Sequence, residues 1–238
     1  MKRAPLIGLA IAYLAALHAT LVATMLWPDW IEGERWRFGA RPAEPASYAA
    51  RLHAYYQAVD ASAAPGRVVL LGDSHFQRMD VGLIGLPALN FGIGGARVSE
   101  IAERMRDYRS IIAARAVIVW GGVNDLLAKQ TPEQTAADMA ALLEGVRGPK
   151  LVLLVSVPPP GKALGPGLAR RVADLNARYA AICESSHACF YVDIHHRLAA
   201  PDGALAAAFD AGDHLHLNRA AYGEVATVLK DAIGEREQ

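Results

Sequence analysis

The chain has 238 residues, which is enough for one domain of ordinary size and a short additional segment. Twenty-four Lys and Arg residues balance 24 Asp and Glu residues, so the formal net charge is zero and the isoelectric point is about 7.1. This balance argues against a nucleic-acid-binding protein, which normally carries a basic domain or stripe. Hydrophobic residues make up 53% of the chain and charged residues 20%, a composition typical of a folded protein.

The N-terminal segment 4–27 is apolar and contains no Asp, Glu, Lys or Arg. As a helix its 24 residues span about 36 Å, which exceeds the hydrocarbon thickness of a bilayer, about 30 Å. Lys2 and Arg3 precede it, and Asp29 and Glu32 follow it. By the positive-inside rule we expect residues 1–27 to form a signal anchor with a cytoplasmic N-terminus. The chain would then cross the inner (cytoplasmic) membrane once, with the bulk of the chain in the periplasm or outside the cell.

Two alternatives remain for this segment. A cleaved secretory signal usually has a shorter apolar region and a small-x-small cleavage site, and no clear Ala-x-Ala site closes this one. The other alternative is a buried helix of a soluble protein. The anchor and the cleaved signal both predict export.

The chain has two cysteines, Cys183 and Cys189, between a predicted helix and a predicted strand. In an exported domain they are able to form a disulfide that closes a short loop. Two free, packed thiols are the alternative. A single pair gives no support for a metal site.

Residues 28–62 are expected to form a juxtamembrane linker followed by a helix over 47–61, and residues 63–238 the main domain. There, short apolar runs alternate with segments of helical spacing. The predicted strands are 67–72, 88–91, 116–120, 150–157 and 189–194. The predicted helices are 98–112, 131–146, 166–185 and 219–233. This alternation predicts an α/β fold with a parallel sheet covered by helices on both faces.

Chemistry-bearing residues follow the predicted strands or precede the last helix. These stretches are Gly-Asp-Ser-His at 72–75, Asn-Phe-Gly-Ile-Gly-Gly at 90–95, Gly-Gly-Val-Asn-Asp at 121–125, and Asp-His-Leu-His at 213–216. Each alone is also ordinary turn chemistry. Because ligands bind at the carboxyl ends of strands in open α/β sheets, the combination indicates a site.

The residues suit acyl transfer. Ser74 is the candidate nucleophile, His216 the candidate base, and Asp213 the group that orients the base. The tetrahedral intermediate needs hydrogen-bond donors for its oxyanion. We expect the backbone N–H groups of Ser74 and Gly95 and the side-chain amide of Asn124 to form that oxyanion hole.

Other templates fit less well. The sequence contains neither the G-x-S-x-G elbow of α/β-hydrolases nor a P-loop motif. Gly92 and Gly94 suggest a dinucleotide fingerprint, but Arg97 stands where its third glycine would fall. Asp193, His195 and His196 lack a metal-ligand spacing.

Taken together, the four stretches resemble the conserved blocks of the SGNH (GDSL-type) hydrolases. The 90–95 and 121–125 stretches look most like the branch containing the platelet-activating-factor acetylhydrolase-like esterases. The resemblance implies a three-layer, flavodoxin-like α/β/α fold. It assigns Ser74, His216 and Asp213 to catalysis, assigns Gly95 and Asn124 to the oxyanion hole, and implies no metal or organic cofactor.

One departure from the family pattern is His75, where many members have Leu. A Gly-Asp-Ser-His start also resembles SGNH domains of some membrane-bound polysaccharide O-acetylation proteins. His75 is a weaker candidate for the base, Trp120 is a candidate for the wall of an acyl pocket, and Arg97 is a candidate contact for an anionic substrate. For Trp120 and Arg97, packing within the strand and a solvated helix start are the simpler alternatives.

The sequence therefore predicts a serine esterase that removes short acyl groups, acetyl above all, from an envelope or exported carbohydrate. The alternatives are a polysaccharide O-acetyltransferase or a lipid or thioester acylhydrolase that uses the same acyl-enzyme. A catalytically inactive binding module has no need of a matched base and oxyanion donors. The expected partners are the ester substrate and, through residues 4–27, a membrane. The sequence does not indicate the oligomeric state.

Overall fold

A computed structural model describes residues 13–18, 47–149, 151–186 and 189–236 of the chain. It divides the chain into two compact units, Met1–Ser47 and Tyr48–Gln238. In the first unit the described residues are the short helical stretch 13–18 and Ser47, so most of the expected span 4–27 and all of residues 28–46 lie outside them. Among the residues that are described, no helix is long and apolar enough to cross a membrane.

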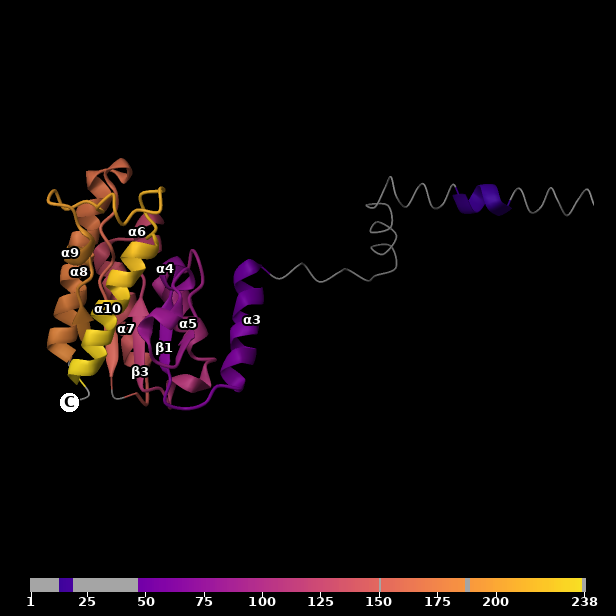
Figure 1. Cartoon of the computed structure of the whole chain (residues 1–238), viewed down its shortest axis with the longest axis horizontal. Helices are drawn as coiled ribbons and strands as arrows, with labels where there is room; N and C mark the ends of the chain where they lie inside the picture. Colours follow the sequence, from indigo (N-terminus) through magenta and orange to yellow (C-terminus); the bar gives the residue numbers. More distant parts are fainter. Residues whose placement is uncertain (1–12, 19–46, 150, 187–188, 237–238) are drawn as a thin grey trace, which may run out of the picture. The chain divides into compact units, whose positions relative to one another are not determined.

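The second unit is built around a five-stranded sheet (Figure 1). Its strands are β1 (Val68–Gly72), β2 (Ala88–Asn90), β3 (Ala116–Trp120), β4 (Val152–Val155) and β5 (Phe190–Val192). Every pairing is parallel, and the order is β2-β1-β3-β4-β5, the order of flavodoxin-like sheets. The predicted α/β fold with a parallel central sheet is confirmed.

The two faces of the sheet carry separate hydrophobic cores, because successive side chains of a strand point to opposite faces. In β3, Val117 and Val119 join one cluster, which includes apolar residues of α5 (Val98–Met105), α7 (Pro132–Gly145) and α8 (Pro166–Ser186). Ile118 and Trp120 join the other cluster, which includes α10 (Arg219–Arg236). All five side chains of β3 are buried, which explains its uninterrupted apolar sequence.

The helices begin where the sequence offers a cap. At the start of α7 the Thr131 hydroxyl accepts a hydrogen bond from the Gln134 N–H at 3.2 Å, and Pro132 occupies the first helical position. The remaining helical elements are α3 (Tyr48–Ala61), which precedes the first strand, and six helices or 3₁₀ turns of three to five residues each. The six are α4 (Ser74–Gln77), η1 (Val81–Ile84), η2 (Arg109–Ile111), α6 (Val123–Leu127), η3 (Lys162–Leu164) and α9 (His195–Leu198).

One predicted helix is interrupted. We expected a single helix over 98–112, but α5 ends at Met105 and the 3₁₀ turn η2 begins at Arg109. The carboxylate of Asp60 accepts hydrogen bonds from the backbone N–H groups of Arg109 at 2.7 Å and Ser110 at 3.0 Å. These bonds satisfy the donors of the new turn in place of a continued helix. They also attach the C-terminal end of α3, where Asp60 lies, to the turn η2.

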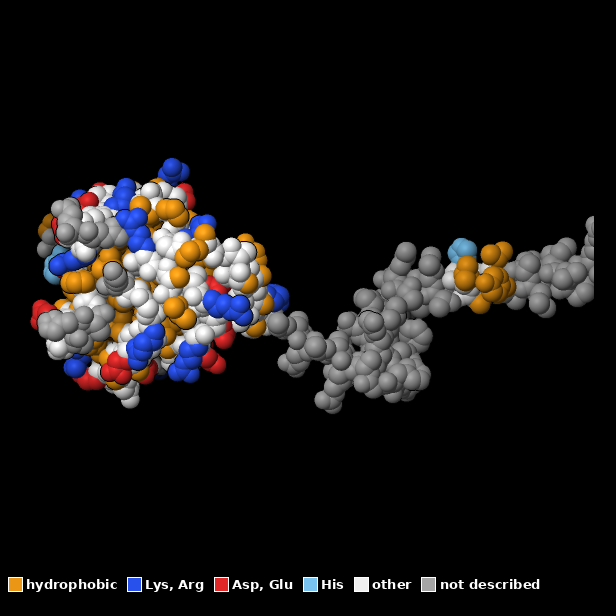
Figure 2. All heavy atoms as spheres, turned by 90° about the horizontal axis from the view of Figure 1, so that it is seen from below, with side chains coloured by type: hydrophobic (Ala, Val, Ile, Leu, Met, Phe, Trp, Pro, Cys, Tyr) orange, Lys and Arg blue, Asp and Glu red, His pale blue; other side chains and the backbone are white. Residues whose placement is uncertain are grey.

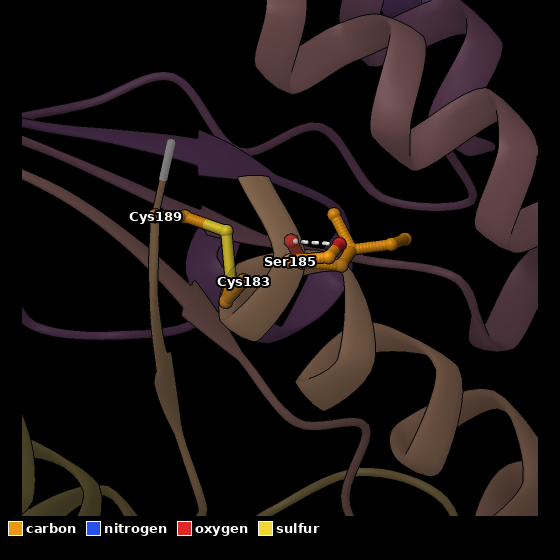
Figure 3. The surroundings of a disulfide bond; sticks show 4 residues. Cys183, Ser185 and Cys189 are labelled. Carbon is orange, nitrogen blue, oxygen red and sulfur yellow. Dashed lines mark hydrogen bonds between the residues drawn. A yellow bond between two sulfur atoms is a disulfide. The ribbon is translucent and has the colours of Figure 1, made fainter. Parts of the chain in front are cut away.

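The two cysteines are joined by a disulfide, which settles the alternative that the sequence left open. Figure 3 shows the bond running from Cys183, near the end of α8, to Cys189, directly before β5. The two cysteines are six positions apart in sequence. The bond between them therefore fixes the end of α8 against β5, a strand at the edge of the sheet. The neighbouring Ser185 hydroxyl donates to the Ile182 carbonyl at 3.2 Å.

The surface of the folded unit agrees with the zero net charge. On the face shown in Figure 2, Lys and Arg side chains are interspersed with Asp and Glu and with apolar side chains. The described side chains on that face form no large field of a single sign that would favour nucleic acid.

Candidate active site

The three loops that follow β1, β2 and β3 meet at one edge of the sheet, since these strands are neighbours and parallel. Ser74 follows β1, Gly95 follows β2, and Asn124 follows β3. This is the carboxyl edge, where open α/β sheets bind their ligands.

Ser74 sits at a tight turn from strand to helix. Gly72 has no room for a side chain, because a Cβ there would lie 2.4 Å from the Trp120 carbonyl oxygen. The Asp73 carboxylate then caps α4 by accepting a hydrogen bond from the His75 N–H at 2.9 Å. Phe76, fully buried, anchors the helix in the core. These contacts hold Ser74 as the first residue of α4, half-buried at the surface of the turn.

Ser74, His216 and Asp213 lie in line, although Ser74 and His216 are 142 residues apart in sequence. The distance from Ser74 Oγ to His216 Nε2 is 2.9 Å, and that from His216 Nδ1 to Asp213 Oδ2 is 2.6 Å. The other carboxylate oxygen of Asp213 accepts from the backbone N–H groups of His216 at 2.7 Å and Leu215 at 3.1 Å. One carboxylate therefore shapes the loop and orients the imidazole.

The charged form of Asp213 is stabilised by this arrangement. Partial burial raises the pKa of the carboxyl, but the hydrogen bonds from the His216 N–H, the His216 ring and the Leu215 N–H outweigh it and hold the pKa well below its usual value. Asp213 is thus ionised at neutral pH, and its Oδ2 faces Nδ1 of His216 while Nε2 of the same ring faces the Ser74 hydroxyl.

The predicted oxyanion donors lie on the loops that follow β1, β2 and β3. The N–H groups of Ser74 and Gly95 donate no backbone hydrogen bond to another described residue. Gly95 has a φ of +77°, and a Cβ there would meet nothing within 4 Å, so it is the backbone conformation that favours glycine. The Asn124 amide nitrogen donates to Ala96 O at 3.0 Å and to Asp73 Oδ2 at 3.3 Å.

The glycines that do require close approach are Gly92 and Gly94. A Cβ on Gly92 would lie 2.5 Å from the Gln77 nitrogen, and one on Gly94 would lie 2.7 Å from Gln77 Oε1. The Gln77 side chain accepts a hydrogen bond from the Gly94 N–H and donates one to the hydroxyl of Tyr48. This side chain therefore fixes the loop that carries Gly95.

Helix α3 supports the same loop. The Tyr56 hydroxyl donates to the Gly92 carbonyl oxygen at 2.9 Å, and burial raises the pKa of Tyr56 to about 12. Sequence reasoning missed Tyr48, Tyr56 and Gln77. Their contacts span 17 to 36 positions along the chain, and no local motif signals them.

Asp125 joins the loops that follow β2 and β3. Its fully buried carboxylate accepts from the Val98 N–H, the first residue of α5, with both oxygens at 3.2 Å. Burial raises the pKa of Asp125 to about 6, while the hydrogen bond from Val98 opposes that rise. The carboxylate was not singled out from the sequence, where Asn-Asp reads as turn chemistry.

The other residues considered from the sequence have different surroundings. Trp120 is buried, and its indole N–H donates to the Ser156 carbonyl at 3.1 Å, so it packs in the core. Arg97 is exposed at the start of α5. His195 Nδ1 lies 3.0 Å from Val157 O, and His196 pairs with Asp193. No group of three His, Cys, Asp or Glu side chains in the described part of the chain is arranged to hold a metal ion.

Comparison with known proteins shows the family to which the chain belongs. The model of the GDSL-like lipase/acylhydrolase family matches residues 74–223, more than half of the chain. The chain therefore belongs to the GDSL-like lipase/acylhydrolase family and is a serine esterase, as the resemblance to SGNH hydrolases implied. A search of curated proteins returned no significant match.

Solved structures share the fold at low sequence identity. A protein from Streptococcus pneumonia, described provisionally as a platelet activating factor, is 17% identical, with a TM-score of 0.69 over 90% of this chain and 99% of its own. A GDSL-like lipase from Bacteroides thetaiotaomicron is 20% identical, with a TM-score of 0.66 over 77% and 98%. An acetylxylan esterase from Geobacillus stearothermophilus is 16% identical, with a TM-score of 0.58 over 71% and 94%.

Proposed function

We propose that this esterase removes short acyl groups, acetyl above all, from a carbohydrate through a covalent intermediate on Ser74. The observation that carries the proposal is the line of contacts from Ser74 Oγ to His216 Nε2 at 2.9 Å and from His216 Nδ1 to Asp213 Oδ2 at 2.6 Å. A serine hydroxyl is a weak nucleophile until a base removes its proton, and these contacts supply both the base and the group that orients it.

In the first half of the proposed reaction, Ser74 Oγ bonds to the ester carbonyl carbon while its proton passes to His216 Nε2. The carbonyl electron pair moves onto oxygen and gives the oxyanion. When the carbonyl re-forms, the bond to the alcohol breaks and the alcohol leaves with the proton from His216. Water then repeats the sequence on the acyl-Ser74, releasing the carboxylic acid and returning the proton to Ser74.

The oxyanion would be bound by the N–H groups of Ser74 and Gly95 and by the Asn124 amide. The amide has two hydrogens, and these face Ala96 O and Asp73 Oδ2. We propose that the oxyanion shares one of these hydrogens when it forms, while Asp73 keeps its contact with the amide.

Two considerations favour an acylated carbohydrate as the substrate. One solved structure with the same fold is that of an acetylxylan esterase, and the predicted export of the domain would bring it to envelope or exported glycans. We propose on the same sequence grounds that residues 4–27 anchor the chain in the inner membrane. An O-acetyltransferase would use the same acyl-enzyme and pass the acetyl group to a sugar hydroxyl instead of water. A lipid or thioester acylhydrolase would differ only in the leaving group.

The experiment is a panel of activated esters of increasing acyl length, followed by acetylated xylo-oligosaccharide, with the full-length protein. We expect hydrolysis of short-chain esters by the wild type and none by Ser74→Ala, while the variant Ser62→Ala, at an exposed serine directly after α3, stays active. Asn124→Ala should lower kcat by about 10²–10³-fold, the scale for one oxyanion donor. Equal rates for wild type and Ser74→Ala across the panel would reject the proposal. Acetyl transfer to an added glycan in place of acetate release would favour the transferase.

A further inference from the structure

A second histidine lies beneath the proposed catalytic residues. The His75 side chain, directly after Ser74, is only 1% exposed. Its Nδ1 lies 3.1 Å from Asp73 Oδ1, and its Nε2 lies 3.3 Å from the carbonyl oxygen of Leu215. Leu215 is the residue before His216, so this one ring connects the turn that carries the nucleophile with the loop that carries the base.

The network continues through Asp73, whose side chain is also 1% exposed. One of its oxygens contacts the His75 ring, and the other accepts from the Asn124 amide at 3.3 Å. A continuous hydrogen-bonded path thus runs from the Leu215 carbonyl through His75 and Asp73 to Asn124. Its two ends hold the two groups that must be placed most accurately around Ser74, the base loop and an oxyanion donor.

The ring has little freedom to leave this position. Its centroid lies 5.0 Å from that of Trp120 and 5.8 Å from that of His216. Trp120 is itself buried and donates its indole N–H to Ser156 O at 3.1 Å. Because both nitrogens of His75 are engaged, its ring is not free to take the proton of Ser74, which removes it as a candidate base.

We propose that His75 is a positioning residue that sets the base loop through Leu215 and the Asn124 amide through Asp73. This inference rests on the proposed roles of Ser74, His216 and Asn124. Both ring nitrogens face oxygen acceptors, at 3.1 Å and 3.3 Å, so any N–H that the ring carries has a partner in the network. Replacing it by an apolar side chain leaves the buried Asp73 carboxylate and the Leu215 carbonyl short of donors. Displacements of about 1 Å at a reacting centre lower rates by up to about 10²-fold.

Three substitutions of His75 separate its two contacts. His75→Leu removes both donors, His75→Gln keeps an amide donor near the position of Nε2, and His75→Asn keeps one near the position of Nδ1. For folded His75→Leu we expect kcat to fall about 10–10²-fold with KM within about two-fold, since the substrate still binds. His75→Gln should recover part of that loss through Leu215, and His75→Asn should recover a part through Asp73. His196→Leu, at an exposed histidine outside the network, is the matched control and should keep the wild-type kcat.

Thermal unfolding of each variant shows whether a loss of rate follows a loss of folded protein. The inference is overturned if the three His75 variants keep kcat within two-fold of the wild type, or if KM alone changes. It is also overturned if the loss merely tracks the folded fraction and the amide variants recover none of it. These outcomes differ from a failure of the proposed function, in which the wild type and Ser74→Ala have equal rates.

¹⁵N-histidine NMR of the wild-type protein tests the hydrogen bonds of the His75 ring without any measurement of activity. A hydrogen-bonded His75 ring proton in slow exchange with water is expected, and a His75 ring whose protons all exchange rapidly with water would contradict the network.

Discussion

The buried carboxyl of Asp125 makes a sharp prediction about stability and pH. In the folded protein its pKa is about 6, against an ordinary value of 3.8, because burial opposes its ionisation. An acid whose pKa is raised by folding binds its proton more tightly in the folded state. Between about pH 4 and 6 the folded protein therefore holds more protons than the unfolded chain, and the contribution of this group to stability decreases as pH rises.

The size of the effect follows from the shift. A rise of about two pKa units corresponds to about 3 kcal/mol, at 1.36 kcal/mol per unit. Below pH 4 the carboxyl is neutral in both states and carries no penalty, whereas above pH 6 the folded protein holds a buried charge. In the variant Asp125→Asn the side chain at position 125 is neutral at every pH. Its amide oxygen is still able to accept the hydrogen bond from the Val98 N–H. The free energy of unfolding of the variant minus that of the wild type should therefore increase by about 3 kcal/mol between pH 4 and 7.

Urea unfolding of the two full-length proteins at a series of pH values measures this difference directly. Subtracting the wild-type curve removes the titration of the other groups, including Asp213, whose lowered pKa acts in the opposite direction. A difference that stays constant from pH 4 to 7, or that decreases over this range, would refute the reasoning.

Three further predictions follow from other contacts. Gly92→Ala places a Cβ 2.5 Å from a backbone nitrogen of α4 and should cost about 2 kcal/mol or more in urea unfolding, whereas Gly167→Ala, with nothing within 4 Å of its Cβ, should be neutral or stabilising. Replacing both Cys183 and Cys189 by Ser should lower the free energy of unfolding by about 2 kcal/mol, from the loop entropy of the six-residue separation; an unchanged midpoint would count against this. Asp213→Asn should lower kcat by up to about 10⁴-fold, yet by less than Ser74→Ala; equal losses would contradict the orienting role of Asp213.

The sheet was predictable because a parallel strand is buried on both faces and reads as an unbroken apolar run. β3 is the clearest example, with five buried residues at the expected positions. The convergence of Ser74, Gly95 and Asn124 was also predictable, since the carboxyl ends of neighbouring parallel strands share one edge. Ser74 and His216 could be paired as candidates by their chemistry, but their distance depends on the path of the chain over 142 residues, which strand ends alone do not fix.

What the sequence did not predict depends on side chains that meet from distant segments. The break after Met105 accompanies the carboxylate of Asp60, which bonds to the backbone 49 and 50 residues later. The hydrogen bond from the Tyr56 hydroxyl to Gly92, in the loop that carries Gly95, likewise joins segments that are 36 residues apart. His75 was noted as a departure from the family, but its contact with the Leu215 carbonyl, 140 residues away, emerges only in three dimensions.

The most direct test of the central claim is to trap the nucleophile. An aryl fluorophosphonate should react with one residue of the full-length protein, and peptide mass mapping should place the adduct on Ser74. His216→Ala should slow the labelling by orders of magnitude, since the hydroxyl at 2.9 Å loses its base. Esterase activity that survives complete labelling, or an adduct on another residue of an active enzyme, would contradict the account.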